Sequence, residues 1–267
     1  MNWEFQIVKR YLATRRKQIF TLFTTVMAIA GIGLGVAALI VTLSIMNGFQ
    51  TDIREKILGT QAHLLVLSGK KRVVNGSSEI LEPVKKLPEI IAVSPFVYGQ
   101  ALLRSAGNTS GVVIKGILPE DEVKVTNISE QIREGRWDVL SHEGESIILG
   151  KELARNLGVF LGEEMYLVSP QSLSTGLFPK IEKFRVQGIF ESGMYEYDSS
   201  LAYISLRNAQ KIFGLSNEIT GYQIKIKDIY HALTLADKLQ KLFGSSYWVR
   251  PWLSLIHISE PTRQAEI

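Results

Sequence analysis

The feature that most limits how this chain can fold is a long apolar run that follows a basic cluster. No charged residue occurs from Ile19 to Met46. As an α-helix with a rise of 1.5 Å per residue, this run would be roughly 40 Å long, whereas the hydrocarbon core of a bilayer is about 30 Å thick. We therefore predict a transmembrane helix over residues 18–49, which spans with tilt or projects a turn or two beyond the bilayer.

The charges that flank this helix predict its orientation. The basic residues before the helix are Lys9, Arg10, Arg15, Arg16 and Lys17, and the only acidic residue there is Glu4. The charges after it, from Asp52 to Lys56, cancel. The positive-inside rule places residues 1–17 in the cytoplasm and the large domain after the helix on the outer side of the membrane. The alternative is a cleaved signal peptide, whose apolar region is normally much shorter and ends in a small-x-small site.

Within the apolar run, Gly31 and Gly35 lie one helical turn apart on one face. Small residues at this spacing let a second helix approach closely in lipid, where packing drives helix association. We therefore predict a helix-packing face at these glycines. The alternative is that glycine is simply common in membrane helices.

The chain after Thr51 predicts an α+β domain over residues 50–252. About 200 residues are enough for one sizeable domain or two small ones. Strand-like runs are expected at 63–67, 90–97, 111–118, 146–149, 165–168, 184–190, 201–205, 222–226 and 247–249. Short helices are expected between them, at 79–87, 153–157, 205–213 with Ser205 as the cap, and 228–243 with Asp228 as the cap. The apolar spacing typical of a helix also continues from Thr51 to Leu58, so we expect the membrane helix to extend as a stalk.

The sequence offers little that points to catalysis. No P-loop motif occurs, so we expect no nucleotide bound by this chain. Its histidines are scattered without metal-ligand spacing, and the absence of cysteine excludes disulfides and thiol chemistry. We interpret the acidic runs at Glu120–Glu122 and Glu143–Glu145 as solvated turns. The modest net charge of +4 is not gathered on one patch outside the N-terminus, so no nucleic-acid partner is expected.

One loop is longer than usual. Hairpins usually close in about two to five residues, but the segment from Pro170 to Lys180 carries Leu173, Leu177 and Phe178 between Pro170 and Pro179. In one interpretation, the loop folds back and buries these side chains on its own domain. In the other, it projects as a grip for a partner protein.

Several motifs together resemble a known family. They are the run from Gly31 through Met46-Asn-Gly-Phe49 to Gln50, Ile57-Leu-Gly59 with His63, Val93-Ser-Pro95, Val113-Ile-Lys-Gly-Ile117, and Gly193-Met-Tyr-Glu-Tyr-Asp-Ser-Ser200. In this order they resemble the lipoprotein-releasing ABC permeases of the LolC/LolE type. The likeness covers Phe5 to about Trp252.

The resemblance implies a subunit in the bacterial inner membrane, with one span, a MacB-like periplasmic domain shared with FtsX-type relatives, and three further spans. It implies pairing with a second LolC/LolE-type permease or with itself, and assembly on LolD-type ATPases that bind the ATP and Mg²⁺. The complex would pass outer-membrane lipoproteins to a LolA-type periplasmic carrier. It also implies lipoprotein contact at Met46 and Phe49, and carrier binding at the loop from Pro170 to Pro179.

The last residues depart from that pattern. Residues 253–267 resemble the translation of a sequencing-library adapter, and we exclude them from fold reasoning. A genuine polar C-terminus is the alternative. Two other classes of protein stay open from the sequence: a single-span sensor or adaptor whose outer domain binds a ligand, and a membrane-anchored enzyme.

Overall fold

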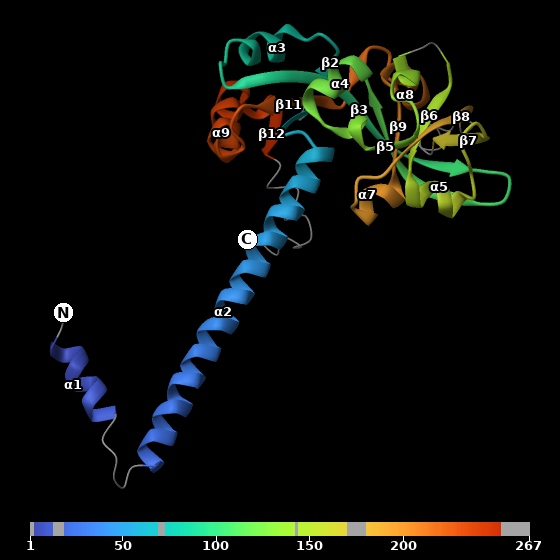
Figure 1. Cartoon of the computed structure of the whole chain (residues 1–267). Helices are drawn as coiled ribbons and strands as arrows, with labels where there is room; N and C mark the ends of the chain where they lie inside the picture. The colour runs from blue at the N-terminus through green and yellow to red at the C-terminus, as the bar shows by residue number, and fades with distance from the viewer. Residues whose placement is uncertain (1–2, 13–18, 69–72, 142–143, 170–179, 252–267) are drawn as a thin grey trace, which may run out of the picture. The chain divides into compact units, whose positions relative to one another are not determined.

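The structure, a computed structural model, describes residues 3–12, 19–68, 73–141, 144–169 and 180–251. It divides into two compact units, Met1–Arg54 and Glu55–Ile267. The first unit contains helix α1 (Trp3–Leu12) and most of helix α2 (Ile19–Thr60) (Figure 1). Helix α2 is continuous through the predicted transmembrane run and the predicted stalk. Its apolar residues up to Phe49 lie on every side of the helix, as in a helix surrounded by lipid.

The second unit has the α+β fold that the sequence predicts. Its strands are β1 (Leu64–Ser68), β2 (Val73–Val74), β3 (Ile90–Arg104), β4 (Thr109–Ile117), β5 (Ile132–Gly135), β6 (Ser146–Gly150), β7 (Glu164–Ser169), β8 (Lys180–Phe190), β9 (Leu201–Ser205), β10 (Glu218–Ile219), β11 (Gly221–Ile226) and β12 (Tyr247–Pro251). Its helices are α3 (Ser78–Lys85), α4 (Pro119–Val125), α5 (Lys151–Leu157), α7 (Tyr195–Ser200), α8 (Leu206–Phe213) and α9 (Ala232–Phe243). Short 3-10 turns lie at Ile128–Gln131, Asp138–Ser141, Ile229–His231 and Gly244–Ser246.

A ten-stranded sheet organises this unit. Its order is β12-β1-β11-β3-β4-β9-β6-β8-β5, and β7 pairs with both β3 and β8. Those two pairings close β3, β4, β9, β6, β8 and β7 into a ring. The pairs β4–β9 and β6–β8 are parallel. The sheet therefore has an open half at β12-β1-β11 and a closed half that contains the β7–β8 hairpin.

Strand β3 belongs to both halves. Its first part, Ile90–Phe96, pairs with β11, and its second part, from Phe96 to Arg104, pairs with β4. Helix α8 packs against β3 and β4 at glycines, since a Cβ at Gly116 would lie 2.2 Å from the Cβ of Ala209. The absence of that carbon lets the helix backbone come close to the sheet.

The apolar core falls into two clusters. The first cluster contains Ala62, Leu65, Phe96 and Val125. The second cluster contains Ile117, Ile128, Leu140, Ile148, Phe190, Leu201 and Tyr203. The half-buried Tyr98 packs against both clusters. The two halves of the fold therefore meet around β3 and its neighbours.

Local signals located most elements, and of the two predicted helix caps one is confirmed and one differs. Ser205 caps α8 as predicted, since its hydroxyl accepts a hydrogen bond from Asn208 N at 3.2 Å. Asp228 instead caps the 3-10 turn Ile229–His231, and α9 begins only at Ala232. The carboxylate of Asp228 bonds Tyr230 N, which satisfies a donor of that tighter turn.

Candidate functional site

The membrane-type helix exposes its whole apolar surface within its unit. The stretch Leu22–Phe49 is long and apolar enough to cross a bilayer, with mean hydropathy 2.5. Its predicted lipoprotein contacts, Met46 and Phe49, are 51% and 60% exposed. At Gly31 and Gly35 no atom lies within 4 Å of where a Cβ would stand. All four positions thus lie on open helix surface, which lipid or another helix must cover.

The predicted grip joins two paired strands. Strands β7 and β8 form an antiparallel hairpin whose last pair is Ser169 with Lys180. The candidate residues between them lie outside the described residues: Pro170, Leu173, Leu177, Phe178 and Pro179. What the structure shows is therefore the base of the hairpin, held in the closed half of the sheet.

An exposed apolar row crosses the sheet beside that base. Val168 of β7 pairs with Leu102 of β3 on one side and with Ile181 of β8 on the other. Paired residues in antiparallel strands present their side chains on the same face. Leu102 and Ile181 are 44% and 59% exposed, and the nearby Tyr166 is 48% exposed. Val168 between them is half-buried, so the row Leu102–Val168–Ile181 extends the hairpin base as a partly exposed apolar surface.

The acidic run at Glu120–Glu122 corrects one sequence interpretation. It is the first turn of α4 rather than a solvated turn, and Glu122 is fully buried. Its carboxylate lies 2.8 Å from Nζ of Lys115, which is also buried, and it accepts hydrogen bonds from Thr126 and Gln223. A carboxylate can be buried among apolar groups only when partners of this kind compensate for its lost hydration.

Lys115 lies between aromatic rings as well as beside Glu122. Its ammonium is 5.9 Å from the ring centre of Tyr98 and 5.6 Å from that of Tyr203. Burial alone lowers the pKa of Lys115, but the Glu122 carboxylate and the neighbouring phenols outweigh it and raise the pKa above its usual value. The ammonium is therefore charged at physiological pH. Among the described residues, Tyr203 Oη is buried and has no hydrogen-bond partner.

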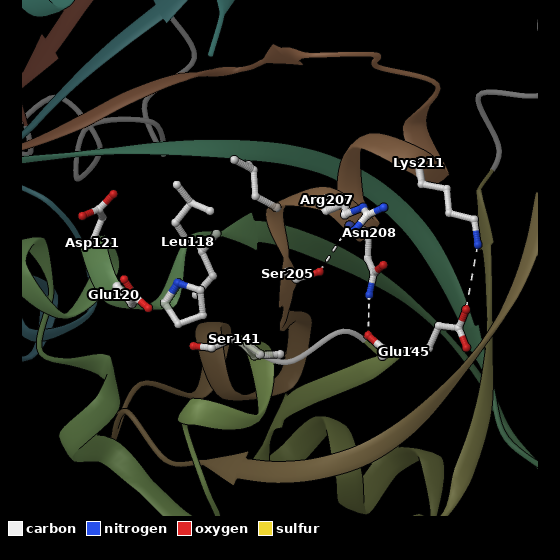
Figure 2. A pocket seen from close by; sticks show the side chains of 14 residues that line it. Leu118, Glu120, Asp121, Ser141, Glu145, Ser205, Arg207, Asn208 and Lys211 are labelled. Atoms are coloured by element: carbon white, nitrogen blue, oxygen red, sulfur yellow. Dashed lines mark hydrogen bonds and ion pairs between the residues drawn. The ribbon is translucent and has the colours of Figure 1, made fainter. Parts of the chain in front are cut away.

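A cleft of about 720 Å³ opens between α4, α8 and the segment before β6. Figure 2 shows Asn208 and Lys211 of α8 facing that segment: Asn208 Nδ2 donates to Gly144 O at 2.8 Å, and Lys211 Nζ lies 3.8 Å from Glu145. The described residues that line the cleft combine carboxylates, cations and hydroxyls with leucine, isoleucine and proline side chains. Within the described part of the chain, no group of three residues could hold a metal ion.

Comparison with known families identifies the fold. The model for the MacB-like periplasmic core domain matches residues 25–242. The chain belongs to the MacB-like periplasmic core domain family. The match therefore includes most of the apolar helix and every strand of the large sheet except β12.

The comparisons with individual proteins confirm the resemblance to LolC and LolE. The chain is 35% identical to the lipoprotein-releasing system transmembrane protein LolC of Neisseria meningitidis over 91% of its own length and 59% of the relative's. It is 29% identical to LolE of Haemophilus influenzae, covering 95% of this chain and 62% of LolE. The chain thus spans about three-fifths of the length of these relatives.

The periplasmic region of MacB from Actinobacillus actinomycetemcomitans aligns with a TM-score of 0.49 at 14% identity, over 77% of this chain and 97% of the MacB region.

Sequence reasoning missed the buried polar cluster of Lys115, Glu122, Thr126 and Gln223. A signal was present: Lys115 is the one charged residue in the strand Val113–Ile117, whose neighbours are apolar or glycine. A charge inside such a strand indicates a buried partner, since lysine is almost never fully buried unless paired.

Proposed function

We propose that this chain belongs to a permease subunit of an ABC transporter that releases outer-membrane lipoproteins from the inner membrane. The observation that carries the proposal is the 35% identity to LolC over 91% of this chain. The exposed apolar helix and the MacB-like core fit this function, because the first can lie in lipid and the second can lie outside it. The energy would come from ATP and Mg²⁺ bound by a LolD-type partner, since this chain has no P-loop motif of its own.

The chain would lie with its N-terminus in the cytoplasm and its MacB-like core in the periplasm. The basic residues before the helix support this orientation, because such residues are retained on the cytoplasmic side. Gly31 and Gly35 would contact a helix of a second LolC/LolE-type permease, or of a second copy. Both positions leave room for the close approach that small residues permit.

Lipoprotein and carrier would contact different parts of the chain. Met46 and Phe49 would contact acyl chains, since both are large, apolar and exposed near the outer end of the helix. The β7–β8 hairpin would bind a LolA-type carrier. The exposed row Leu102–Val168–Ile181 beside the hairpin base supports this, because an apolar surface on a soluble domain favours a partner.

The test is reconstitution of the full-length gene product with its ATPase partner in liposomes that hold a lipoprotein. We expect ATP-dependent transfer of the lipoprotein to purified carrier, and no transfer with a non-hydrolysable ATP analogue. A protein that binds neither ATPase nor carrier would contradict the proposal and would favour the single-span sensor instead.

A further inference from the structure

The two outermost strands of the large sheet differ in how they are protected from pairing with another molecule. A strand at the end of a sheet presents unpaired N–H and C=O groups, to which a strand of another chain can bind. At one end, β5 is four residues long, its pairing with β8 shifts register between Ile132 and Glu134, and Arg133 and Glu134 are exposed. Short length, a bulge and charge each disfavour pairing with a further strand.

Strand β12, at the other end of the sheet, is regular and rich in residues that favour strands. It pairs with β1 in one register, from Tyr247 opposite Ser68 to Pro251 opposite Leu64. Tyrosine, tryptophan and valine occupy its first three positions, and all three residue types are enriched in strands. Among the strands that the structure describes, β1 is the only one paired with β12, so the outer edge of β12 needs another means of protection.

The side-chain amide of Gln240 occupies that outer edge. Gln240 lies on α9 and is half-buried. Its Nε2 donates to Tyr247 O at 2.9 Å, and its Oε1 accepts a hydrogen bond from Val249 N at 2.8 Å. One amide group therefore binds a carbonyl and an N–H that lie two residues apart on β12, which is how one residue of a parallel neighbouring strand would bind them.

The alternation of the backbone extends this protection to the end of the strand. In an extended strand, the N–H and C=O of one residue point to one side and those of the next residue to the other. Since backbone groups of Tyr247 and Val249 face Gln240, those of Pro251 also face the outer edge, whereas Trp248 and Arg250 face β1. Proline has no N–H to donate. Beyond Tyr247, the one N–H on the outer edge of β12 is therefore that of Val249, which Gln240 binds.

We propose that Gln240 keeps the sheet from joining, edge to edge, with β12 of a second copy of the chain. The same edge on two copies is enough for a two-fold contact, because antiparallel pairing centred on Val249 brings the Val249 N–H of each copy to a carbonyl of the other. The amide of Gln240 takes that place within one molecule. This inference goes beyond the proposed transport function and does not depend on it.

The experiment uses the full-length protein purified in detergent. Gln240→Met keeps the length of the side chain but removes its donor and its acceptor. Lys241→Met is the matched control, since it introduces the same residue at the next position of α9, where the side chain is exposed. A third variant adds Val249→Pro to Gln240→Met and so removes the donor from the strand edge. We measure molar mass by light scattering over a range of protein concentrations, and hydrogen exchange of the backbone N–H groups of β1 and β12.

At low protein concentration, Gln240→Met should raise the exchange rate of the Val249 N–H about two- to tenfold, as expected for the loss of one hydrogen bond. At high concentration, the molar mass of this variant should roughly double, because two copies pair through the same edge. The Val249 N–H should then regain its protection, since a strand of the second copy binds it. The Lys241→Met control and the variant with Val249→Pro should keep the molar mass of wild type at every concentration.

A Gln240→Met variant with the molar mass of wild type at every concentration would overturn the inference. Association of Lys241→Met would overturn it as well, since the added apolar side chain would then be the cause. So would association that persists when Val249→Pro is added. A larger species in which the N–H groups of β1 also lose their protection would contradict the inference too, because local unfolding rather than strand pairing would then join the copies.

Discussion

Replacing Glu122 by leucine should destabilise the second unit strongly. The substitution leaves the ammonium of Lys115 buried without its carboxylate, and Gln223 and Thr126 each lose an acceptor. Removing one partner of a buried ion pair costs about 3–5 kcal/mol. For a unit of this size each kcal/mol lowers the melting temperature by about 2–4 °C, so we expect a fall of roughly 6–20 °C.

The loss of stability in Glu122→Leu should depend on pH, and the pKa of Lys115 determines whether it grows or shrinks. In the wild type the pKa of Lys115 is raised above its ordinary value of 10.5, so the stability it provides is complete below that pH and is lost only above it. In Glu122→Leu, burial without the carboxylate lowers the pKa of Lys115. The unfolded variant then binds more protons than the folded one, so its stability rises with pH up to about 10.5. The gap between variant and wild type should therefore narrow from pH 7 to pH 10.

Urea or thermal unfolding of the detergent-solubilised protein measures this effect. Tryptophan fluorescence is a suitable signal, because Trp137 packs edge-on against Tyr203 beside the polar cluster. The centres of the two rings are 5.8 Å apart. The control is the double variant Lys115→Met with Glu122→Leu. It removes both charges and should recover most of the lost stability, since apolar replacement of a whole buried pair is often neutral.

Two outcomes would refute this reasoning. A Glu122→Leu variant within about 1 kcal/mol of wild type would mean that Lys115 finds solvent or another partner at little cost. A deficit that grows between pH 7 and pH 10 would mean that the stranded lysine is not its cause.

Three further predictions concern the proposed function. In this cysteine-free sequence, a cysteine at Leu233 should react with a membrane-impermeant maleimide in cells with a permeabilised outer membrane, and one at Lys9 should not; the reverse pattern would contradict the orientation. Gly31→Leu should reduce co-purification of the second permease about tenfold, whereas Gly33→Leu on the opposite face should not, and equal effects would exclude a specific packing face. Leu177→Asp should weaken carrier capture about tenfold, and Leu233→Asp, a charge added at an exposed site on α9, should leave it unchanged; retained capture by the first variant would indicate a purely structural loop.

Much of the secondary structure could be predicted because its signals are local. The charge-free run from Ile19 predicts a membrane helix without knowledge of any partner. The cap residues Ser205 and Gly214 mark the start and the end of α8. The order of strands could not be predicted in the same way. The parallel pairing of Val113 with Leu201, for example, joins segments far apart in the chain. Neither segment contains a turn or a repeat that indicates the other.

The candidate sites also differ in whether local signals can predict them. The helix and hairpin candidates follow from composition, spacing and resemblance, and they remain predictions. The sequence does not predict the buried cluster, because the polarity of the acidic run alone indicates solvent exposure. Glu122 is buried since α4 places it over the sheet, where Lys115 of β4 and Gln223 of β11 both reach it. Only the strand order brings those two residues to one carboxylate.

This geometry gives the polar cluster a consequence beyond stability. Glu122 bonds a strand of the closed ring through Lys115 and a strand of the open half through Gln223. Hydrogen bonds fix relative position more narrowly than apolar contact, because they lose their energy when direction and distance change. The contacts of Glu122 with Lys115 and Gln223 therefore fix the register between the two halves of the sheet. An apolar replacement of the Lys115–Glu122 pair should therefore preserve the fold and still loosen that register.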